Sequence, residues 1–189
     1  MRTVIIAGVG GVGSHLAYMI AKHSYKEKIA DRLVLVDNDK VETKNLSRQY
    51  YFESDLDQYK VLALAEAIKR INPNMVVTIA PETIQDYFGA VNIDYDNTIC
   101  CCATDDLESK KFIAEAFTKY IIGSCDRGVI EITVDASEYN NAWSFGTGYT
   151  VIQDIASNVI VASLMLKVLL KMINNQPVKN IKLNLNELI

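Results

Sequence analysis

The sequence lacks several features that would divide it or give it an unusual composition. Three prolines occur in 189 residues, and the chain contains no Pro/Gly/Ser-rich linker, internal repeat or low-complexity tract. It also lacks blocks of like charge, and its formal net charge of −4 argues against a nucleic-acid-binding protein. Because half of the residues are apolar, we expect one globular domain with a substantial core.

Paired cysteines and long apolar runs are also missing. The four cysteines form no Cys-x-x-Cys motif, so we expect no zinc site, and we expect reduced thiols in a cytoplasmic protein. The apolar run at 3–7 is too short for a signal peptide. The most apolar stretch, 155–173, is interrupted by Asn158, Lys167 and Lys171. This composition favours a buried or interface helix over a membrane-spanning one, so we expect no membrane partner.

Short apolar runs alternate with longer amphipathic segments along the whole chain. Continuous apolar runs are typical of parallel strands that are covered on both faces. The patterns predict strands at 3–7, 32–36, 75–80, 98–103, 120–123, 128–135 (half-exposed) and 181–185, helices at 14–23, 54–71, 83–91, 106–118 and 152–173, and a loop with a short strand at 137–148. The alternation predicts a doubly wound, Rossmann-like α/β domain with a mainly parallel sheet, helices on both faces and antiparallel strands toward the C-terminus.

A glycine-rich turn follows the first predicted strand and opens the first predicted helix: Gly8-Val9-Gly10-Gly11-Val12-Gly13-Ser14. Gly8 permits a tight turn, Gly10 lets backbone amides approach a phosphate, and Gly13 allows the helix to pack closely on the strand. The helix N-terminus adds unpaired N–H groups and a partial positive charge. Asp37, at the end of the second strand, can accept hydrogen bonds from ribose hydroxyls. These features predict a nucleotide site but leave NAD, flavin, S-adenosylmethionine and ATP open.

The segment that follows narrows the choice of nucleotide. Residues 37–49 read DNDKVETKNLSRQ, and Arg48 and the later Lys60 add two cations near an anion-binding turn. Two extra cations suit a triphosphate, whose charge must be neutralised as it is cleaved.

Here the sequence resembles the ThiF/MoeB/HesA family, the adenylating domains related to ubiquitin-activating E1 enzymes. Four segments carry the resemblance: GxGGxGS at 8–14, D-x-D-x-V-x-x-x-N-L-x-R-Q at 37–49, Q-x-K-V at 58–61 with I-N-P at 71–73, and T-D at 104–105. Asp106 stands where the family usually has Asn.

The resemblance implies ATP-dependent adenylation of a carboxylate, commonly the C-terminus of a ubiquitin-like or sulfur-carrier protein or a peptide. It implies ATP contacts from Gly8, Gly10, Gly11, Gly13, Ser14, Asp37, Asp39, Asn45, Arg48, Gln49 and Lys60. Asp105 would bind Mg²⁺, an ion that one or two carboxylates commonly hold together with phosphates. Arg48, Lys60 and Asp105 would be the catalytic residues. The two cations would stabilise the departing pyrophosphate while the carboxylate attacks the α-phosphorus.

Several of these assignments have an ordinary structural alternative. Arg48 could form a surface ion pair, and Lys60 could be a solvated charge on an amphipathic helix. Asp105 and Asp106 also resemble a helix N-terminus, where the helix dipole stabilises carboxylates. Asp39 could order its loop or contact the ligand.

A catalytic cysteine is a separate question, because some relatives pass the adenylate to an enzyme thiol. Such a thiol must be exposed and have a lowered pKa. Residues 100–102 lie in a predicted buried strand, so Cys125, in a predicted turn near Arg127, is the only reasonable nucleophile. No cysteine follows it, which favours adenylation without a covalent enzyme intermediate. We expect His15 and His23 to be packed or exposed rather than catalytic.

The sequence departs from the family in its length. It begins at the first strand, without the arginine-bearing N-terminal helix of many relatives, and 135–148 leaves no room for a long crossover loop. We expect a single domain over 1–189, with a nucleotide-binding core at 1–123 and a shortened C-terminal part at 124–189. The helix at 152–173 predicts a homodimer interface, or else a core helix. The alternative functions are a catalytically idle ATP-binding scaffold that acts with a partner subunit, a nicotinamide-dependent oxidoreductase, and a tRNA-modifying or small-molecule-adenylating relative.

Overall fold

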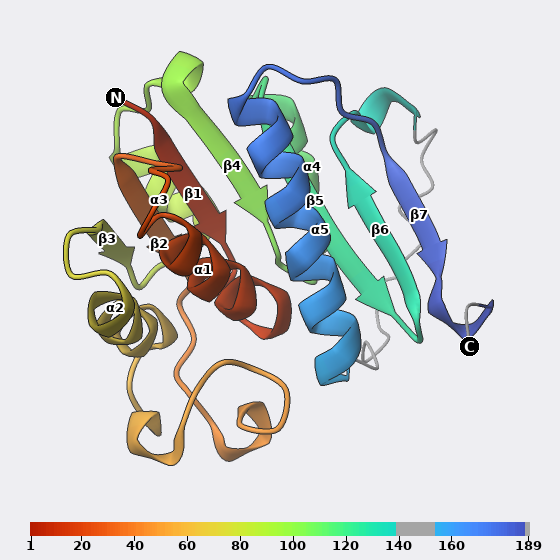
Figure 1. The fold of residues 1–189 in the computed structure, drawn as a ribbon. Helices are drawn as coiled ribbons and strands as arrows, with labels where there is room; N and C mark the ends of the chain where they lie inside the picture. Colours follow the sequence, from red (N-terminus) through yellow and green to blue (C-terminus); the bar gives the residue numbers. More distant parts are fainter. Residues whose placement is uncertain (139–153, 188–189) are drawn as a thin grey trace.

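The computed structural model describes residues 1–138 and 154–187, which form a seven-stranded sheet with helices on both faces (Figure 1). The strands are β1 (Thr3–Ala7), β2 (Arg32–Val36), β3 (Val76–Ala80), β4 (Thr98–Cys102), β5 (Tyr120–Asp126), β6 (Val129–Thr133) and β7 (Ile181–Asn184). The α-helices are α1 (Gly11–His23), α2 (Lys60–Ile71), α3 (Ile84–Ala90), α4 (Leu107–Ala116) and α5 (Ile155–Ile173). Short 3-10 helices lie at Thr43–Asn45, Glu53–Asp55, Tyr95–Asn97, Ala136–Glu138 and Leu185–Glu187.

The order of the sheet is β3-β2-β1-β4-β5-β6-β7. The first five strands in this order are parallel, whereas β6 pairs antiparallel with β5 and β7 pairs antiparallel with β6. The predicted doubly wound, mainly parallel sheet with antiparallel strands toward the C-terminus is therefore confirmed.

Both faces of the sheet are covered, which explains why its strands are continuously apolar. In β1, Val4 and Ile6 belong to a core shared with α1, α2 and α5, whereas Ile5 and Ala7 belong to a second core on the side of α3 and α4 (Figure 1). All four side chains are fully buried. Neighbouring side chains of a strand point to opposite faces, so a strand between two cores must be apolar at every position.

The order of the sheet reverses at β1, which lies between β2 and β4. The carboxyl ends of β1 and β4 are adjacent, because Ala7 pairs with Cys102. In open α/β sheets, ligands bind in the crevice outside the carboxyl ends of the strands at such a switch point. The glycine turn follows β1 and the Thr104–Asp105 turn follows β4, so the fold brings these two segments together.

The second helix begins later than predicted. Glu53–Asp55 form a separate 3-10 helix, Asp57 adopts a left-handed backbone with φ of 65°, and α2 starts at Lys60. The left-handed residue redirects the chain, so that the segment hydrogen-bonds to both the N–H and the carbonyl of Val41. The later start matters for the site, because it places Lys60 beside the loop that follows β2.

The hairpin of β5 and β6 also differs from the prediction. β5 continues past its predicted end, and Arg127 and Gly128, with φ of 48° and 82°, form the two-residue turn. Two successive positive φ values suit the twist of such a hairpin. The predicted turn position of Cys125 is therefore wrong, since it lies in a buried strand. β6 is mostly buried rather than half-exposed, and its Glu131 pairs with Lys182 of β7.

Helix α5 is long and apolar enough to cross a membrane by length and composition. In this structure it packs alongside α1 and against β5 and β6 (Figure 1). Val161, Met165 and Leu169 on its inner face are completely buried. α5 is therefore part of the helical layer that covers the sheet. Most of the loop and short strand predicted at 137–148 lies outside the described residues.

Candidate functional site

A cavity of about 970 Å³ opens at the carboxyl ends of β1 and β4. This volume lies near the upper end of the range for small-molecule pockets. Most of the predicted site residues line the cavity: Gly8, Gly10, Gly11, Asp37, Asp39, Asn45, Arg48, Gln49, Lys60, Asp105 and Cys125. The fold thus gathers residues from segments that are far apart in the sequence.

The glycine turn has no space for side chains at two of its positions. Gly8 has a φ of 80°, and a Cβ there would lie 3.0 Å from the backbone nitrogen of Thr104. A Cβ on Gly13 would lie 1.9 Å from the carbonyl oxygen of Gly8, so α1 packs directly on the turn. The first turn of α1 contains no acidic residue. Its N-terminus therefore offers N–H groups and a partial positive charge to an anion in the cavity.

Gly13 and Ser14, which the resemblance placed among the ATP contacts, do not line the cavity. Ser14 is completely buried, and its Oγ accepts a hydrogen bond of 3.0 Å from the backbone N–H of Tyr50. The Tyr51 hydroxyl donates to the carbonyl of Val9 at 2.7 Å. These bonds tie the loop that carries Arg48 and Gln49 to the glycine turn. In this structure Gly13 and Ser14 support the cavity wall, and their contact with ATP stays a prediction.

Asp37 connects the end of β2 to the glycine turn. Its carboxylate accepts hydrogen bonds from the N–H of Val9 at 2.8 Å and from the N–H of Asp39 at 2.9 Å. Burial raises the pKa of the Asp37 carboxyl above its usual value, while the Lys60 ammonium and the two hydrogen bonds oppose the rise. Each carboxylate oxygen has a second lone pair, so Asp37 can also accept from a hydroxyl of a ligand in the cavity.

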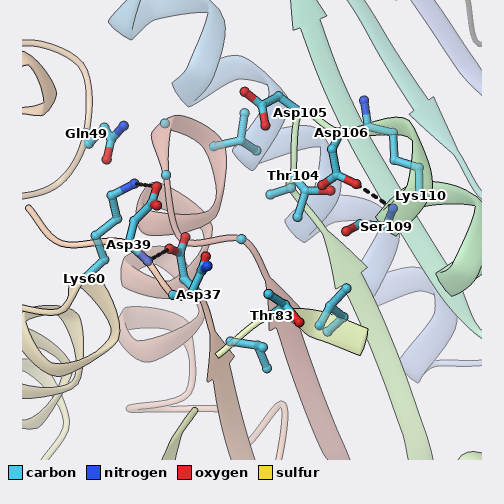
Figure 2. Close-up of a pocket in the computed structure, with 18 of the residues that line it drawn as sticks. Asp37, Asp39, Gln49, Lys60, Thr83, Thr104, Asp105, Asp106, Ser109 and Lys110 are labelled. Atoms are coloured by element: carbon cyan, nitrogen blue, oxygen red, sulfur yellow. Dashed lines mark hydrogen bonds and ion pairs between the residues drawn. The ribbon is translucent and has the colours of Figure 1, made fainter. Parts of the chain in front are cut away.

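Lys60 is a buried cation at the edge of the cavity. It is 6% exposed, and its Nζ donates to Asp39 Oδ2 at 2.7 Å (Figure 2). Its backbone N–H also donates to the carbonyl of Asp39, so the start of α2 and the loop after β2 are joined twice. The alternative of a solvated charge is wrong for Lys60. Asp39 orders its loop and also lines the cavity.

The loop after β2 presents Asn45, Arg48 and Gln49 to the cavity. The guanidinium of half-buried Arg48 donates to the carbonyl of Lys44 at 2.7 Å, and no ion pair involves Arg48 in the described part of the chain. Gln49 is 9% exposed, and its buried Oε1 finds no hydrogen-bond partner among the described residues. A buried polar atom of this kind calls for a partner such as a ligand or a water molecule.

The turn after β4 gives its two aspartates different roles. Asp106 caps α4, with its Oδ1 accepting the N–H of Ser109 at 2.6 Å (Figure 2). Asp105 is exposed, lines the cavity and makes no hydrogen bond within 1–138 and 154–187. Asp106 therefore caps a helix, which was the structural alternative considered for both aspartates. The described residues contain no group of three or more His, Cys, Asp or Glu suited to a metal. A lone carboxylate fits Mg²⁺ where phosphates supply further ligands, which is the arrangement expected at Asp105.

On the α4 side of the cavity lies a cation, Lys110, that was not among the site residues predicted from the sequence. Lys110 lines the cavity, is 5% exposed, and lies across the pocket from Lys60 (Figure 2). Its spacing of four residues from the cap Asp106 places it on the same side of α4, one turn further on. That spacing in T-D-D-x-x-x-K is the signal from which it could have been found.

Cys125 lacks the properties of a nucleophile in this structure. It is 4% exposed, and its thiol donates a hydrogen bond to Asn158 Oδ1 at 3.3 Å. Burial, with smaller contributions from Asp154 and Asp126, raises the pKa of the Cys125 thiol to about 11. A reactive cysteine requires the opposite shift toward the thiolate. These properties argue against Cys125 as a nucleophile and agree with the expectation of adenylation without a covalent enzyme intermediate.

A doubly wound sheet with a glycine turn and a polar cavity at its switch point defines a nucleotide-binding class of α/β proteins. Within that class, residues 2–147 match the ThiF family, and the chain belongs to this family. It is similar to ubiquitin-like modifier-activating enzyme 5 of Caenorhabditis elegans, with 33% identity over 78 residues, covering 41% of this chain and 17% of the relative. It is also similar to the adenylyltransferase and sulfurtransferase MOCS3 of Mus musculus, with 30% identity over 115 residues, covering 60% and 24%.

Solved structures share the fold at low sequence identity. Escherichia coli MccB with ATP has a TM-score of 0.73 and 18% identity, covering 97% of this chain and 64% of MccB. PaaA has a TM-score of 0.73 and 20% identity, covering 99% of this chain and 62% of PaaA. The chain spans less than two thirds of the length of each of these four proteins.

Proposed function

We propose that this protein uses ATP to adenylate a carboxylate and releases pyrophosphate. The proposed carboxylate is the C-terminus of a ubiquitin-like protein or of a peptide. Membership of the ThiF family supports the reaction class, and MccB, which shares the fold, was solved with ATP and with MccA. One observation carries the proposal: the N-terminus of α1, the cations Arg48 and Lys60 and the carboxylate of Asp105 all border one cavity.

In the proposed reaction, an oxygen of the acceptor carboxylate attacks the α-phosphorus of ATP. The bond from the α-phosphorus to the pyrophosphate oxygen breaks, and an acyl adenylate forms. Asp37 accepts hydrogen bonds from the ribose, and the glycine-turn amides hold the phosphates. Arg48 and Lys60 stabilise the charge that develops on pyrophosphate, and their fixed positions avoid reorganisation during the step. Mg²⁺ held by Asp105, when bound, neutralises phosphate charge.

Acceptor-dependent ATP–pyrophosphate exchange tests this function. Ubiquitin-like proteins and peptides with a free C-terminus are compared with the same chains amidated at the C-terminus, which cannot attack. We expect exchange only with free carboxylates, and a loss of roughly 100-fold in the Arg48→Ala and Asp105→Ala variants. Undiminished exchange in both variants would show that the site assignment is wrong.

Two other results of the same experiment would favour the alternative functions. Calorimetric binding of ATP with no exchange toward any acceptor would favour an idle scaffold that needs a partner subunit. Tighter binding of NAD than of ATP would favour an oxidoreductase.

We also propose a two-fold homodimer and a cytoplasmic location. Several apolar side chains of α5, among them Ile160, Leu164 and Leu170, are only partly buried, and Ile155 at its start is 51% exposed. Isologous contact between two copies would cover such a surface. All four cysteines are free and buried, which is compatible with a reducing compartment. Light scattering after gel filtration tests the dimer, with an expected mass of twice 21.1 kDa.

A further inference from the structure

The backbone carbonyl of Arg48 is held by two buried side chains from different helices. His15 Nε2, on α1, and Asn158 Nδ2, on α5, each lie 3.3 Å from this oxygen. A carbonyl oxygen only accepts, so His15 must carry a proton on Nε2. Burial lowers the pKa of His15, against a smaller opposing effect of its hydrogen bond to Arg48, and so favours the neutral ring. Two helices thus converge on one peptide group.

Cys125 supplies the third member of this network. Its thiol donates a hydrogen bond of 3.3 Å to Asn158 Oδ1. With Oδ1 toward the thiol, Nδ2 faces the Arg48 carbonyl. The reverse orientation would bring two acceptors together at Arg48, whereas the Cys125 sulfur could accept weakly from an amide N–H, so the Arg48 carbonyl is the group that distinguishes the two ends of the amide. Asn158 is completely buried, so an unpaired end of its amide would be costly.

The hydrogen bonds to the Arg48 carbonyl fix the backbone from which the Arg48 guanidinium extends. Within the described residues, the side chain of Arg48 has one hydrogen bond, to the carbonyl of Lys44 in its own loop. The position of the charged group therefore depends on where the Arg48 backbone is held. A misplacement of a catalytic group by about 1 Å can cost about 100-fold in rate.

We propose that His15 and Asn158 are positioning residues for Arg48, with the Cys125 thiol as the hydrogen-bond partner of the other end of the Asn158 amide. The two donors hold the Arg48 peptide so that its guanidinium faces the triphosphate. This role rests on the proposed function, in which Arg48 binds the departing pyrophosphate.

A double-mutant cycle tests whether Asn158 acts through the side chain of Arg48. The dissociation constant of Mg-ATP is measured by calorimetry for the wild type, Asn158→Ala, Arg48→Ala and the double variant. With Arg48 present, Asn158→Ala is expected to weaken binding by about five- to tenfold, the effect of one lost hydrogen bond. In the Arg48→Ala background, the same change is expected to have less than about a twofold effect, because there is no guanidinium left to misplace.

The pair His15→Ala and His15→Gln tests the donor from α1. Gln retains a side-chain N–H of similar reach, so His15→Gln is expected to recover most of the affinity that His15→Ala loses. If Asn158→Ala does not fold, the ATP affinities of the two His15 variants still test the positioning role. Val161→Ala is the matched control: Val161 is fully buried on the same helix and does not line the cavity. It is expected to lower the unfolding midpoint without changing ATP affinity.

Three results would overturn the positioning role. An equal loss of affinity in both backgrounds would show a general structural role for Asn158. Equal affinities for His15→Ala and His15→Gln would show that the N–H is irrelevant. If Arg48→Ala binds ATP as tightly as the wild type and also retains exchange, Arg48 does not have the role that the proposed function assigns to it. The first two results, in contrast, would refute only the positioning role and would leave the proposed function of Arg48 intact.

Discussion

The replacement Gly13→Ala is predicted to destabilise the whole domain, because the contact of α1 with the glycine turn has no room for a methyl group. The new Cβ would lie 1.9 Å from the carbonyl oxygen of Gly8 and 2.9 Å from its carbonyl carbon. Both are backbone atoms, which cannot rotate away as the end of a side chain can. The turn itself must therefore move.

The magnitude follows from the cost of overpacking. Extra methyl groups in well-packed interiors cost about 1–3 kcal/mol, and a backbone obstacle places this site at the upper end. For a protein of this size each kcal/mol shifts the unfolding midpoint by about 2–4 °C, so we expect a loss of about 6–12 °C. Displacement of the amides at Gly10 and Gly11 should also weaken ATP binding, since these residues line the cavity.

Gly89→Ala is the matched control for this prediction. Gly89 lies in α3, and a Cβ there would meet no atom within 4 Å. Alanine is the better helix former, so this variant should be unchanged or more stable by up to about 1 kcal/mol. Thermal unfolding followed by circular dichroism, with calorimetry of ATP binding, measures both effects. An unchanged midpoint for Gly13→Ala, or an equal loss for Gly89→Ala, would refute the packing argument.

Three further predictions concern charges and thiols. Lys60→Met should keep or raise the unfolding midpoint, because a buried ammonium is costly to desolvate. The same variant should lose roughly 100-fold in pyrophosphate exchange. A loss of both thermal stability and exchange would contradict this prediction. Asp106→Ala should cost about 1 kcal/mol of stability, because the N-terminal cap of α4 is lost. Asp105→Ala should leave the stability unchanged and reduce only pyrophosphate exchange. Thermal unfolding and exchange assays of the two variants measure these effects. None of the four cysteines should react with Ellman's reagent in the native protein, and all four should react in guanidinium chloride; one rapidly reacting native thiol would argue against the burial described.

Much of the fold was predictable because the hydrophobic pattern is consistent along the chain. Strands buried on both faces are continuously apolar, as in β1 and β4, and the helices show apolar residues at helical spacing. The predicted bounds of α2 and β5 were wrong because the backbone turns there at residues other than glycine. Asp57 and Arg127 adopt positive φ values, which few non-glycine residues adopt and which composition does not reveal. The late start of α2 and the long β5 follow from these two residues.

The sequence indicated candidate site residues, most of which line one cavity, but not their arrangement. The run at 37–49 and Lys60 indicated which side chains to consider. Burial, pairing and capping separated those side chains into groups that face the cavity and groups that support it. Asp106 caps a helix while Asp105 has no hydrogen-bond partner among the described residues, although the two are adjacent and chemically identical. Only the direction of the chain at the start of α4 distinguishes them.

The sequence by itself determined the fold class and the family, because hydrophobic periodicity and local motifs depend on neighbouring residues. The tertiary structure decided the surroundings of Cys125, Asn158 and Lys110, because burial and hydrogen bonding arise from segments that meet only in the folded chain. The pKa of the Cys125 thiol rises to about 11 because a sheet and a helix enclose it. Asn158 reaches the Arg48 carbonyl from 110 residues away, a contact that no local pattern encodes.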